Sequence, residues 1–419
     1  MRRGDERLPS VPVRTARRLL LEGCALGSPP LKATSRSVIS LVRRLGFVQI
    51  DSISSVERAH HLIMHARLDG YAPRHLAHHA EKTRELFEHW THDASLIRSD
   101  WLPWWSHRLE RDRRRILASG WMRQRLGSNW ARSTREVLAL LEESGPLGVR
   151  EVHERLDGSR PRSTGWWEWS PRKSALELLW RTGEVAIHSR RGFEKLYDLA
   201  SRVHGARPSP PAAEACRGWA CTQALERLGA ATAREIAGFL GAVSPAEALE
   251  WCNAAAGEGL VEAVLLERLG RPPRPGFARR GWGEVDGSET LDDTPRLLAP
   301  FDPLIRDRLR TRELFGFDHR FEAYVPAPRR LFGYYAMPVV VGERIVGRLD
   351  LASDRPAGVL RVDRAFAEAG GSRRKVAGLA REAAARLASQ LDLGLDWRAR
   401  RITAVPSDLP WVTSSAGAR

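Results

Sequence analysis

The pentapeptide FVQID, residues 47–51, holds the pair of polar side chains whose spacing best suits chemistry. If it is extended, Gln49 and Asp51 point to one face of the strand, and the apolar side chains of Val48 and Ile50 point to the other. The two polar Cβ atoms then lie about 6–7 Å apart, so an amide and a carboxylate project together into a cleft. Such a carboxylate activates water or offsets a developing positive charge. The alternative is the polar face of an edge strand.

Histidines are concentrated in one stretch, since nine of the thirteen lie between residues 60 and 107. His61 and His65 have an i, i+4 spacing that suits a metal chelate on a helix. The chain has no HExxH motif and no cysteine nearby, so we predict no metal site and expect His60 and His61 to make local hydrogen bonds or to face solvent or phosphate. The sequence has neither a Walker A loop nor a strand followed by G-x-G-x-x-G, so no nucleotide cofactor is predicted.

The run APFDPLIRDR, residues 299–308, places two acids and two arginines beside apolar residues. One interpretation is a structural corner of ion pairs built on Asp302 and Asp307. The other is that Arg306 or Arg308 is presented to a phosphate or a substrate, with an aspartate holding it in place. The sequence favours the structural interpretation slightly.

The composition indicates a polyanionic partner. The 419 residues carry 67 basic and 51 acidic side chains, a net charge of 67 − 51 = +16, and nearly all the basic residues are arginines, whose planar fork suits phosphates and guanine edges. Charge alone does not separate nucleic acid from an anionic membrane. No apolar run is long enough to span a bilayer, and the N-terminus lacks the apolar core of a secretory signal. The four cysteines form no C-x-x-C pair, so a reduced, cytoplasmic protein is expected.

The elements expected to position FVQID are helices. An apolar pattern at helical spacing from Thr34 to Leu45, closed by Gly46, predicts a helix directly before it. The segment SSVERAHHLIMHARL, residues 54–68, predicts another directly after it. Further on, residues 101–135 mix five tryptophans, Trp121 among them, with nine arginines, Arg123 among them, against two acids, a net charge of 9 − 2 = +7. This segment is either a helix with tryptophans in a core and a solvated basic face or a nucleic-acid surface.

An internal repeat follows at a constant offset of 84 residues, with 140–152 aligned to 224–236. Each copy predicts a helix, a glycine-containing turn, two further helices and a β-hairpin, which is the order of a winged helix. The first hairpin begins at Gly183 and turns at Arg190-Arg191-Gly192, so its tip is basic. Pro- and Gly-rich residues 206–213 and 271–288 are expected to be linkers or loops.

The chain therefore divides into four expected domains. Residues 10–130 form a diverged, winged-helix-like domain that carries FVQID, 131–205 a second winged helix and 214–270 a third. From residue 321 the apolar period changes to two, and FEAYVPAP, LFGYYAMPVVV, RIVGRLDL and GVLRVDR predict strands, followed by a helix and a last strand. Residues 290–405 are thus a β-rich, barrel-like domain, and the fold class is α+β, mainly α.

Several motifs together resemble a known family. FVQIDSISSVERAHH, GEVAIHSRRGFEKLYDL, PFDPLIRDR and the strands from 317 to 351 occur in the order found in the bacterial winged-helix DNA glycosylases of the AlkZ/YcaQ group, over about residues 10–405. The catalytic motif of that group is Gln, an apolar residue, then Gln or Asp. Gln49-Ile50-Asp51 resembles the YcaQ branch, in which a carboxylate occupies the third position.

The resemblance implies excision of alkylated purines and unhooking of interstrand crosslinks made through guanine N7. Asp51 would stabilise positive charge at the sugar and orient or deprotonate water, and Gln49 would hold that water or the sugar. The nearest lysines along the sequence are Lys32 and Lys82, so a monofunctional enzyme without a lyase step is expected. A crosslinked guanine cannot flip freely, so the site should be open.

The resemblance also implies the partners. We expect a monomer that binds double-stranded DNA, without cofactor, metal or membrane, in the bacterial cytoplasm at the nucleoid. The residues expected to contact DNA are Arg190, Arg191, Arg306, Arg308, His60 and His61. Two alternatives stay open at this point: a winged-helix transcription regulator that is no enzyme, and a protein that recognises damage without cutting.

Overall fold

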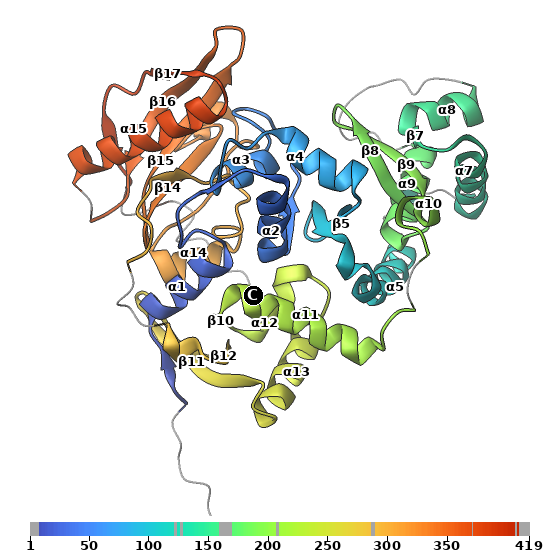
Figure 1. Ribbon diagram of the computed structural model, residues 1–419, viewed down its shortest axis with the longest axis horizontal. Coiled ribbons are helices and arrows are strands. Elements are labelled where there is room, and N and C mark those ends of the chain that lie inside the picture. The colour runs from blue at the N-terminus through green and yellow to red at the C-terminus, as the bar shows by residue number, and fades with distance from the viewer. Residues whose placement is uncertain are drawn as a thin grey trace, which may run out of the picture.

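The computed structural model describes residues 8–120, 124–125, 129–158, 170–206, 209–285, 290–370, 372–406 and 409. Trp121 and Arg123, part of the basic tryptophan segment, lie outside the described residues. Within them the strands form five sheets, one of six strands, one of four, two of three and one of two. The N-terminal helices α2 to α4 lie in the middle of the molecule, between the C-terminal sheet and the unit that contains β8 (Figure 1).

The N-terminal unit surrounds one short strand. Its elements are β1 (Ser10–Val11), α1 (Val13–Gly23), β2 (Leu31–Lys32), α2 (Ser35–Leu45), β3 (Phe47–Gln49), α3 (Ala59–His65), β4 (Leu68–Asp69), α4 (Pro73–Ala77), the π-helix η1 (His78–Lys82), β5 (Leu86–Trp90), β6 (Ala94–Arg98), the 3-10 helix η2 (Ser99–Trp101) and α5 (Leu102–Ala118). The sheet order is β3-β6-β5, all antiparallel.

Local capping fixes where α2 gives way to β3. The Thr34 side chain accepts a hydrogen bond from the Ser37 backbone N–H, which begins the helix, and Gly46 ends it with a φ of +86°. A Cβ at Gly46 would lie 2.8 Å from the Trp101 ring and 2.9 Å from Arg227 Nε. Glycine is therefore required here both for its conformation and for the close approach.

The two repeat copies have the same order of elements. The first contains α7 (Trp130–Ser144), β7 (Leu147–Gly148), α8 (Val149–Asp157), α9 (Pro171–Thr182), β8 (Val185–Arg191) and β9 (Glu194–Leu199), followed by α10 (Ala200–His204). The second contains α11 (Ala213–Leu228), β10 (Ala230–Ala231), α12 (Ala233–Leu240), α13 (Pro245–Gly257), β11 (Val261–Arg268) and β12 (Arg271–Arg279), followed by η3 (Trp282–Glu284). The repeat in sequence is therefore a repeat of elements, each ending in a hairpin.

The expected loop from residue 271 was wrong, because β12 runs from Arg271 to Arg279 in this segment. It pairs with both β11 and β10. Prolines without a backbone N–H are tolerated near the hairpin end, where the register of the ladder shifts between Leu266 and Arg268. The hairpin thus extends beyond residue 270, the expected end of this unit.

The C-terminal segment forms a curved sheet covered by one helix. It contains β13 (Arg296–Leu297), α14 (Arg308–Phe315), η4 (Ala327–Arg329), β14 (Ala336–Val341), β15 (Arg344–Asp354), β16 (Val359–Ala367), α15 (Arg373–Gln390), β17 (Gly394–Trp397) and β18 (Ile402–Ala404). Strands β13 to β16 are antiparallel neighbours, and β17 and β18 both pair with β16 in parallel. Helix α15 lies across β14–β16 (Figure 1).

One strand prediction and one helix prediction were wrong, in each case because the segment bonds to residues outside it. FEAYVPAP is a turn, because the buried Glu322 carboxylate accepts hydrogen bonds from the backbone N–H groups of Leu331 and Phe332. Residues 54–58 are not helical, because the Ser55 carbonyl oxygen accepts from the Ser353 backbone N–H at 2.8 Å, which attaches this loop to β15. Helix α3 therefore begins only at Ala59.

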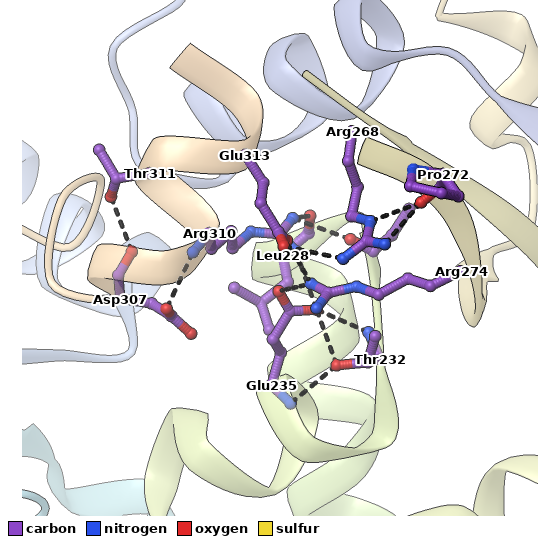
Figure 2. Close-up of polar contacts among 11 residues, drawn as sticks. Leu228, Thr232, Glu235, Arg268, Pro272, Arg274, Asp307, Arg310, Thr311 and Glu313 are labelled. Atoms are coloured by element: carbon purple, nitrogen blue, oxygen red, sulfur yellow. Dashed lines mark hydrogen bonds and ion pairs between the residues drawn. The ribbon is translucent and has the colours of Figure 1, made fainter. Parts of the chain in front are cut away.

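Arginine–carboxylate contacts attach the β11–β12 hairpin to α14 (Figure 2). Arg274 Nη2 lies 2.8 Å from both a Glu235 and a Glu313 carboxylate oxygen. Arg268 donates to Glu313 at 3.0 Å, and Arg310 donates to two backbone carbonyl oxygens between α11 and α12 at 2.9 and 2.8 Å. These arginines bind carboxylates and carbonyl oxygens of the protein itself. Part of the net positive charge therefore stabilises the fold and is not available to a partner. Among the described helices, none is both long and apolar enough to cross a membrane.

A buried ion pair joins the N-terminal unit to the run at 299–308. Arg67 and Asp302 are both almost fully buried and meet in two hydrogen bonds of 2.7 and 2.9 Å. Arg67 also donates to the Cys24 carbonyl oxygen at 2.6 Å. The structural interpretation of Asp302 is therefore confirmed.

Removing Asp302 should be costly, because Arg67 would remain buried without its counter-charge. We expect Asp302→Ala to lower the free energy of unfolding by about 3–5 kcal/mol, measured by urea denaturation followed through tryptophan fluorescence. The matched control is Glu110→Ala, which breaks an exposed i, i+4 pair with Arg114 and should cost less than about 0.5 kcal/mol. Equal, small losses in both variants would contradict the structural importance of the buried pair.

Candidate active site

Gln49 and Asp51 lie where β3 leaves the sheet. In the β3–β6 register Gln49 faces Ser95, and the Ile50 backbone N–H still donates to the Ala94 carbonyl oxygen at 2.8 Å. Continuing this antiparallel register by two residues places Asp51 opposite Asp93, in the turn that joins β5 to β6. Because cross-strand neighbours share a face, an amide and two carboxylates line one side of this edge.

Asp93 was missed by the sequence analysis and is held firmly in its turn. Its carboxylate accepts from the Ala94 backbone N–H at 2.8 Å, and its carbonyl oxygen accepts from the Thr91 backbone N–H at 3.0 Å. The Ser95 hydroxyl also donates to that carbonyl oxygen, at 3.1 Å. The only sequence signal was a turn-forming His-Asp between two apolar stretches, which does not reveal the partner strand.

The environment favours the protonated form of Asp51 more than water does. Burial raises the pKa of the Asp51 carboxyl, and the charge of Asp93 raises it further, while a 2.7 Å hydrogen bond from the Ile53 backbone N–H works in the opposite direction. Burial also raises the pKa of Asp93. A carboxylate with a raised pKa beside a second carboxylate is the pattern of a general base or of a group that meets a cation.

The loop that follows Asp51 is attached to the C-terminal sheet by a hydrogen bond and an ion pair. The Ser353 hydroxyl donates to the Val56 carbonyl oxygen at 2.7 Å, and Arg355 pairs with Glu57 at 2.7 Å. Beside this contact lies Tyr335, fully buried, whose hydroxyl has no hydrogen-bond partner among the described residues. Burial raises the pKa of Tyr335, and the charges of Asp51 and Glu57 raise it further, so its hydroxyl stays neutral next to the acid.

His60 and His61 lie on the opposite side of β3 from Asp51. They line a cleft of about 350 Å³ to which Ile50, Arg58 and Phe193 also contribute. Burial lowers the pKa of His60 well below its usual value and that of His61 to about 4, so both rings are neutral near pH 7. His61 Nδ1 is hydrogen-bonded to the Tyr71 hydroxyl at 2.8 Å. For His61 this favours the expected local hydrogen bond over phosphate binding, whereas the buried His60 Nδ1 has no hydrogen-bond partner among the described residues.

The two arginines of the first hairpin differ in their surroundings. Arg190 makes two hydrogen bonds to the buried Glu88 carboxylate, at 2.8 and 2.7 Å, and lies over the Phe193 ring. Arg191 has a side chain that is 62% exposed and reaches only a long, 3.4 Å contact with Glu151. Arg191 is therefore available to a partner, whereas Arg190 serves to attach the hairpin to β5.

The two arginines of the 299–308 run differ in the same way. Arg306 lies over the rings of both Phe47 and Phe239 and donates to the Phe239 carbonyl oxygen, and burial lowers its pKa to about 10. Arg308 is exposed at the first residue of α14. Of this pair, only Arg308 is an exposed residue, and Arg306 is partly buried.

In the described part of the basic tryptophan segment, tryptophans lie in a core and arginines face solvent, as the structural interpretation expected; DNA binding by this face stays a prediction. Trp101 and Trp105 are buried in a core that includes Phe47, and their rings contact Trp219. Arginines on the other side of α5 are exposed, with Arg114 at 79%. Among the described residues, no group of three or more His, Cys, Asp or Glu side chains is placed to hold a metal ion.

Comparison with known proteins gives first the class and then the family. A family model of DNA glycosylases matches residues 42–389, most of the chain, so the protein is an enzyme that hydrolyses N-glycosyl bonds in DNA. Within this class, the chain belongs to the AlkZ-like DNA glycosylase family. The predicted resemblance is thus confirmed, and the alternative of a regulator without enzymatic activity is not supported.

A solved structure has the same fold. The DNA glycosylase AlkZ of Streptomyces sahachiroi superposes with a TM-score of 0.58 at 18% sequence identity, covering 93% of this chain and 100% of that one. At this identity the similarity shows the fold, which mixes helices with a curved sheet. The site residues and the type of lesion must be argued from the geometry of this chain.

Proposed function

We propose that this DNA glycosylase excises N7-alkylated purines and unhooks N7-guanine interstrand crosslinks, with Asp51 and Gln49 as its catalytic residues. The observation that carries the proposal is the half-buried Asp51 carboxylate at the end of β3, beside Asp93 and the buried Gln49 amide. Alkylation at N7 makes the purine cationic and a good leaving group, so little acid catalysis is needed. What the reaction needs is negative charge beside C1′.

Each side chain then has one task. As the C1′–N9 bond breaks, electrons move to the departing base and an oxocarbenium-like sugar forms. Asp51 stabilises this positive charge and accepts a proton from the water that attacks C1′. Gln49 offers an amide donor and acceptor to that water or to the sugar. Asp93 keeps the proton affinity of Asp51 high, which strengthens it as a base.

A monofunctional reaction is proposed although the structure brings one lysine closer than the sequence indicated. Lys195 of β9 lowers the pKa of Asp93, so it lies on the same side of the molecule. Its ammonium group lies 3.6 Å from the centre of the Trp180 ring and 3.9 Å from Glu88. These partners hold the amine away from nucleophilic use, so borohydride should trap no covalent DNA adduct.

We also propose that the repeat units act as tandem winged helices that grip duplex DNA. In each repeat unit the hairpin follows three helices, and the second hairpin continues past residue 270. The first hairpin carries the exposed Arg191 at its tip. Arg308 and the exposed arginines of α5 supply further positive charge. This grip is proposed for a monomer, because the site needs no residue from a second copy.

The catalytic assignment is tested with an oligonucleotide that contains N7-methylguanine. We expect Asp51→Asn to slow single-turnover base release by about 10²-fold or more, because the amide neither accepts a proton nor carries charge. Asp100→Asn, which changes an exposed carboxylate of η2 paired with Arg98, should leave the rate within twofold. Undiminished release by Asp51→Asn would overturn the role of Asp51, and no release by the unchanged protein would overturn the lesion class.

The pH dependence of release tests the coupling of the two acids. Activity should fall as the pH falls through the raised pKa of Asp51, because the protonated carboxyl is no longer a base. In Asp93→Asn one cause of the raised pKa is removed, so the acid limb of the profile should move to lower pH. Spontaneous base loss is subtracted at each pH. An unchanged or higher limb would contradict the coupling.

The grip is tested by the salt dependence of DNA binding. Arg191→Ala should weaken binding and reduce the slope of log K against log salt by about 1, because one phosphate contact is lost. The matched control is Arg398→Ala, whose side chain is 55% exposed beside Asp396 on β17, at the far edge of the C-terminal sheet (Figure 1). Equal slopes for the Arg191 variant and the unchanged protein would remove Arg191 from the interface.

A further inference from the structure

Tyr324 is an aromatic side chain that the fold leaves in solvent. It is 77% exposed, more than any other large apolar side chain among the described residues; the next, Leu31, is 59% exposed. Tyrosine combines an apolar ring with a polar hydroxyl, and for this reason it is enriched at interfaces. The question is therefore what this ring contacts.

The exposure of Tyr324 is built into a fixed turn. The Val325 backbone N–H donates to the Glu322 carbonyl oxygen at 3.0 Å, which closes the turn around Tyr324. The Glu322 side chain is only 2% exposed and accepts from the backbone N–H groups of Leu331 and Phe332 at 3.1 and 2.7 Å. Arg330 donates to the Val325 carbonyl oxygen at 2.7 Å. Five residues thus hold the ring outward at a defined place.

That place is next to the candidate active site. The Tyr324 ring contacts Phe321 edge-on, with centroids 6.2 Å apart, and Phe321 contacts Tyr335 at 5.6 Å. The Tyr335 carbonyl oxygen accepts a hydrogen bond from the Leu351 backbone N–H at 3.4 Å. The Leu351 carbonyl oxygen in turn accepts from the hydroxyl of Ser55, in the loop after Asp51, at 3.4 Å. Burial raises the pKa of Tyr324, and the charge of Asp51 raises it further, so the phenol is neutral near pH 7 and lies within electrostatic range of that carboxylate.

The local charge explains why an aromatic residue suits this position. Asp51 and Asp93 repel the phosphate backbone that must approach them. An arginine here would attract DNA, but its positive charge would lower the pKa of Asp51, which weakens the base. An uncharged ring attracts DNA by stacking on a base and leaves both carboxylates as they are.

We propose that Tyr324 is a binding site for a nucleobase, stacking on a base that becomes unstacked where the duplex opens at the lesion. This rests on the proposed function, since it assigns a DNA contact to the same site. The ring replaces a lost stacking neighbour, as wedge side chains do in other DNA-bending proteins, and holds the sugar of the lesion open towards Asp51.

The test compares ring variants in single-turnover release of N7-methylguanine at increasing enzyme concentration. Tyr324→Ala should raise the half-saturating concentration by about tenfold, the order expected for one base–aromatic stack. Tyr324→Phe and Tyr324→Trp, which keep the ring, should stay within twofold. The matched control is Leu31→Ala, a 59% exposed side chain of β2, which lies outside the repeat units proposed to bind DNA.

A second measurement identifies the stacked base and separates stacking from a structural role. Three duplexes carry an abasic analogue opposite the lesion, 5′ to it or 3′ to it, and each is combined with Tyr324→Ala in a double-mutant cycle. Where the stacked base is absent, the variant and the unchanged protein should have the same half-saturating concentration. Full additivity at all three positions would overturn the proposal.

The outcomes also distinguish this inference from the proposed function. If the unchanged protein releases no methylguanine, the proposed function fails. If it releases the base and Tyr324→Ala does so with an unchanged half-saturating concentration, only the nucleobase site fails. Equal thermal unfolding of Tyr324→Ala and the unchanged protein, expected for so exposed a side chain, excludes misfolding as a cause of any loss.

Discussion

The pairing of β3 with β6 is the constraint on which the active site depends. The strand has only three residues, all of them buried, and its two faces enter different cores. Val48 packs with α2 and the C-terminal sheet, whereas Phe47 packs with Trp101 and Phe239. A strand fixed on both faces cannot slip in register, because a shift of one residue would exchange its core and site side chains. Gln49 and Asp51 therefore keep one orientation.

Several arginines connect parts of the protein that are far apart in sequence. The net charge of +16 predicted a polyanion, and the family assignment agrees with that prediction. Yet Arg67, Arg190 and Arg310 are held by buried carboxylates or carbonyl oxygens between units that are far apart in sequence. Arginine serves here as an internal connector, in addition to the DNA contacts proposed for Arg191 and Arg308. Composition records the sum of these two uses and cannot separate them.

Local patterns predicted the local features of the fold. Alternation in FVQID placed Gln49 and Asp51 on one face, and the offset of 84 residues located two copies of the same element order, because both depend on short periods along the chain. What failed depended on distant partners. Asp93 lies opposite Asp51 only because of the β3–β6 register. Residues 321–328 form no strand because the Glu322 carboxylate accepts a hydrogen bond from the Phe332 backbone N–H.

The same holds for the predicted DNA contacts. Arg191 and Arg308 are exposed, as a ligand of phosphate must be, whereas Arg190 and Arg306 are each fixed by a neighbour that the sequence does not place beside them. Nothing in the residues around position 324 marked a tyrosine for solvent, since the ring is exposed by a turn and a buried carboxylate.

The attachment of the Asp51 loop to β15 has a consequence for biosynthesis. The contacting residues Ser55 and Leu351 are 296 positions apart, so the loop has no partner until most of the chain has left the ribosome. At about 5–20 residues per second, the N-terminal unit waits some tens of seconds with its acid pair unsupported. Such long-range closure is slow by nature. A nascent chain that stalls before residue 351 thus lacks the partner of the Asp51 loop, and completion of the site waits for β15 to emerge.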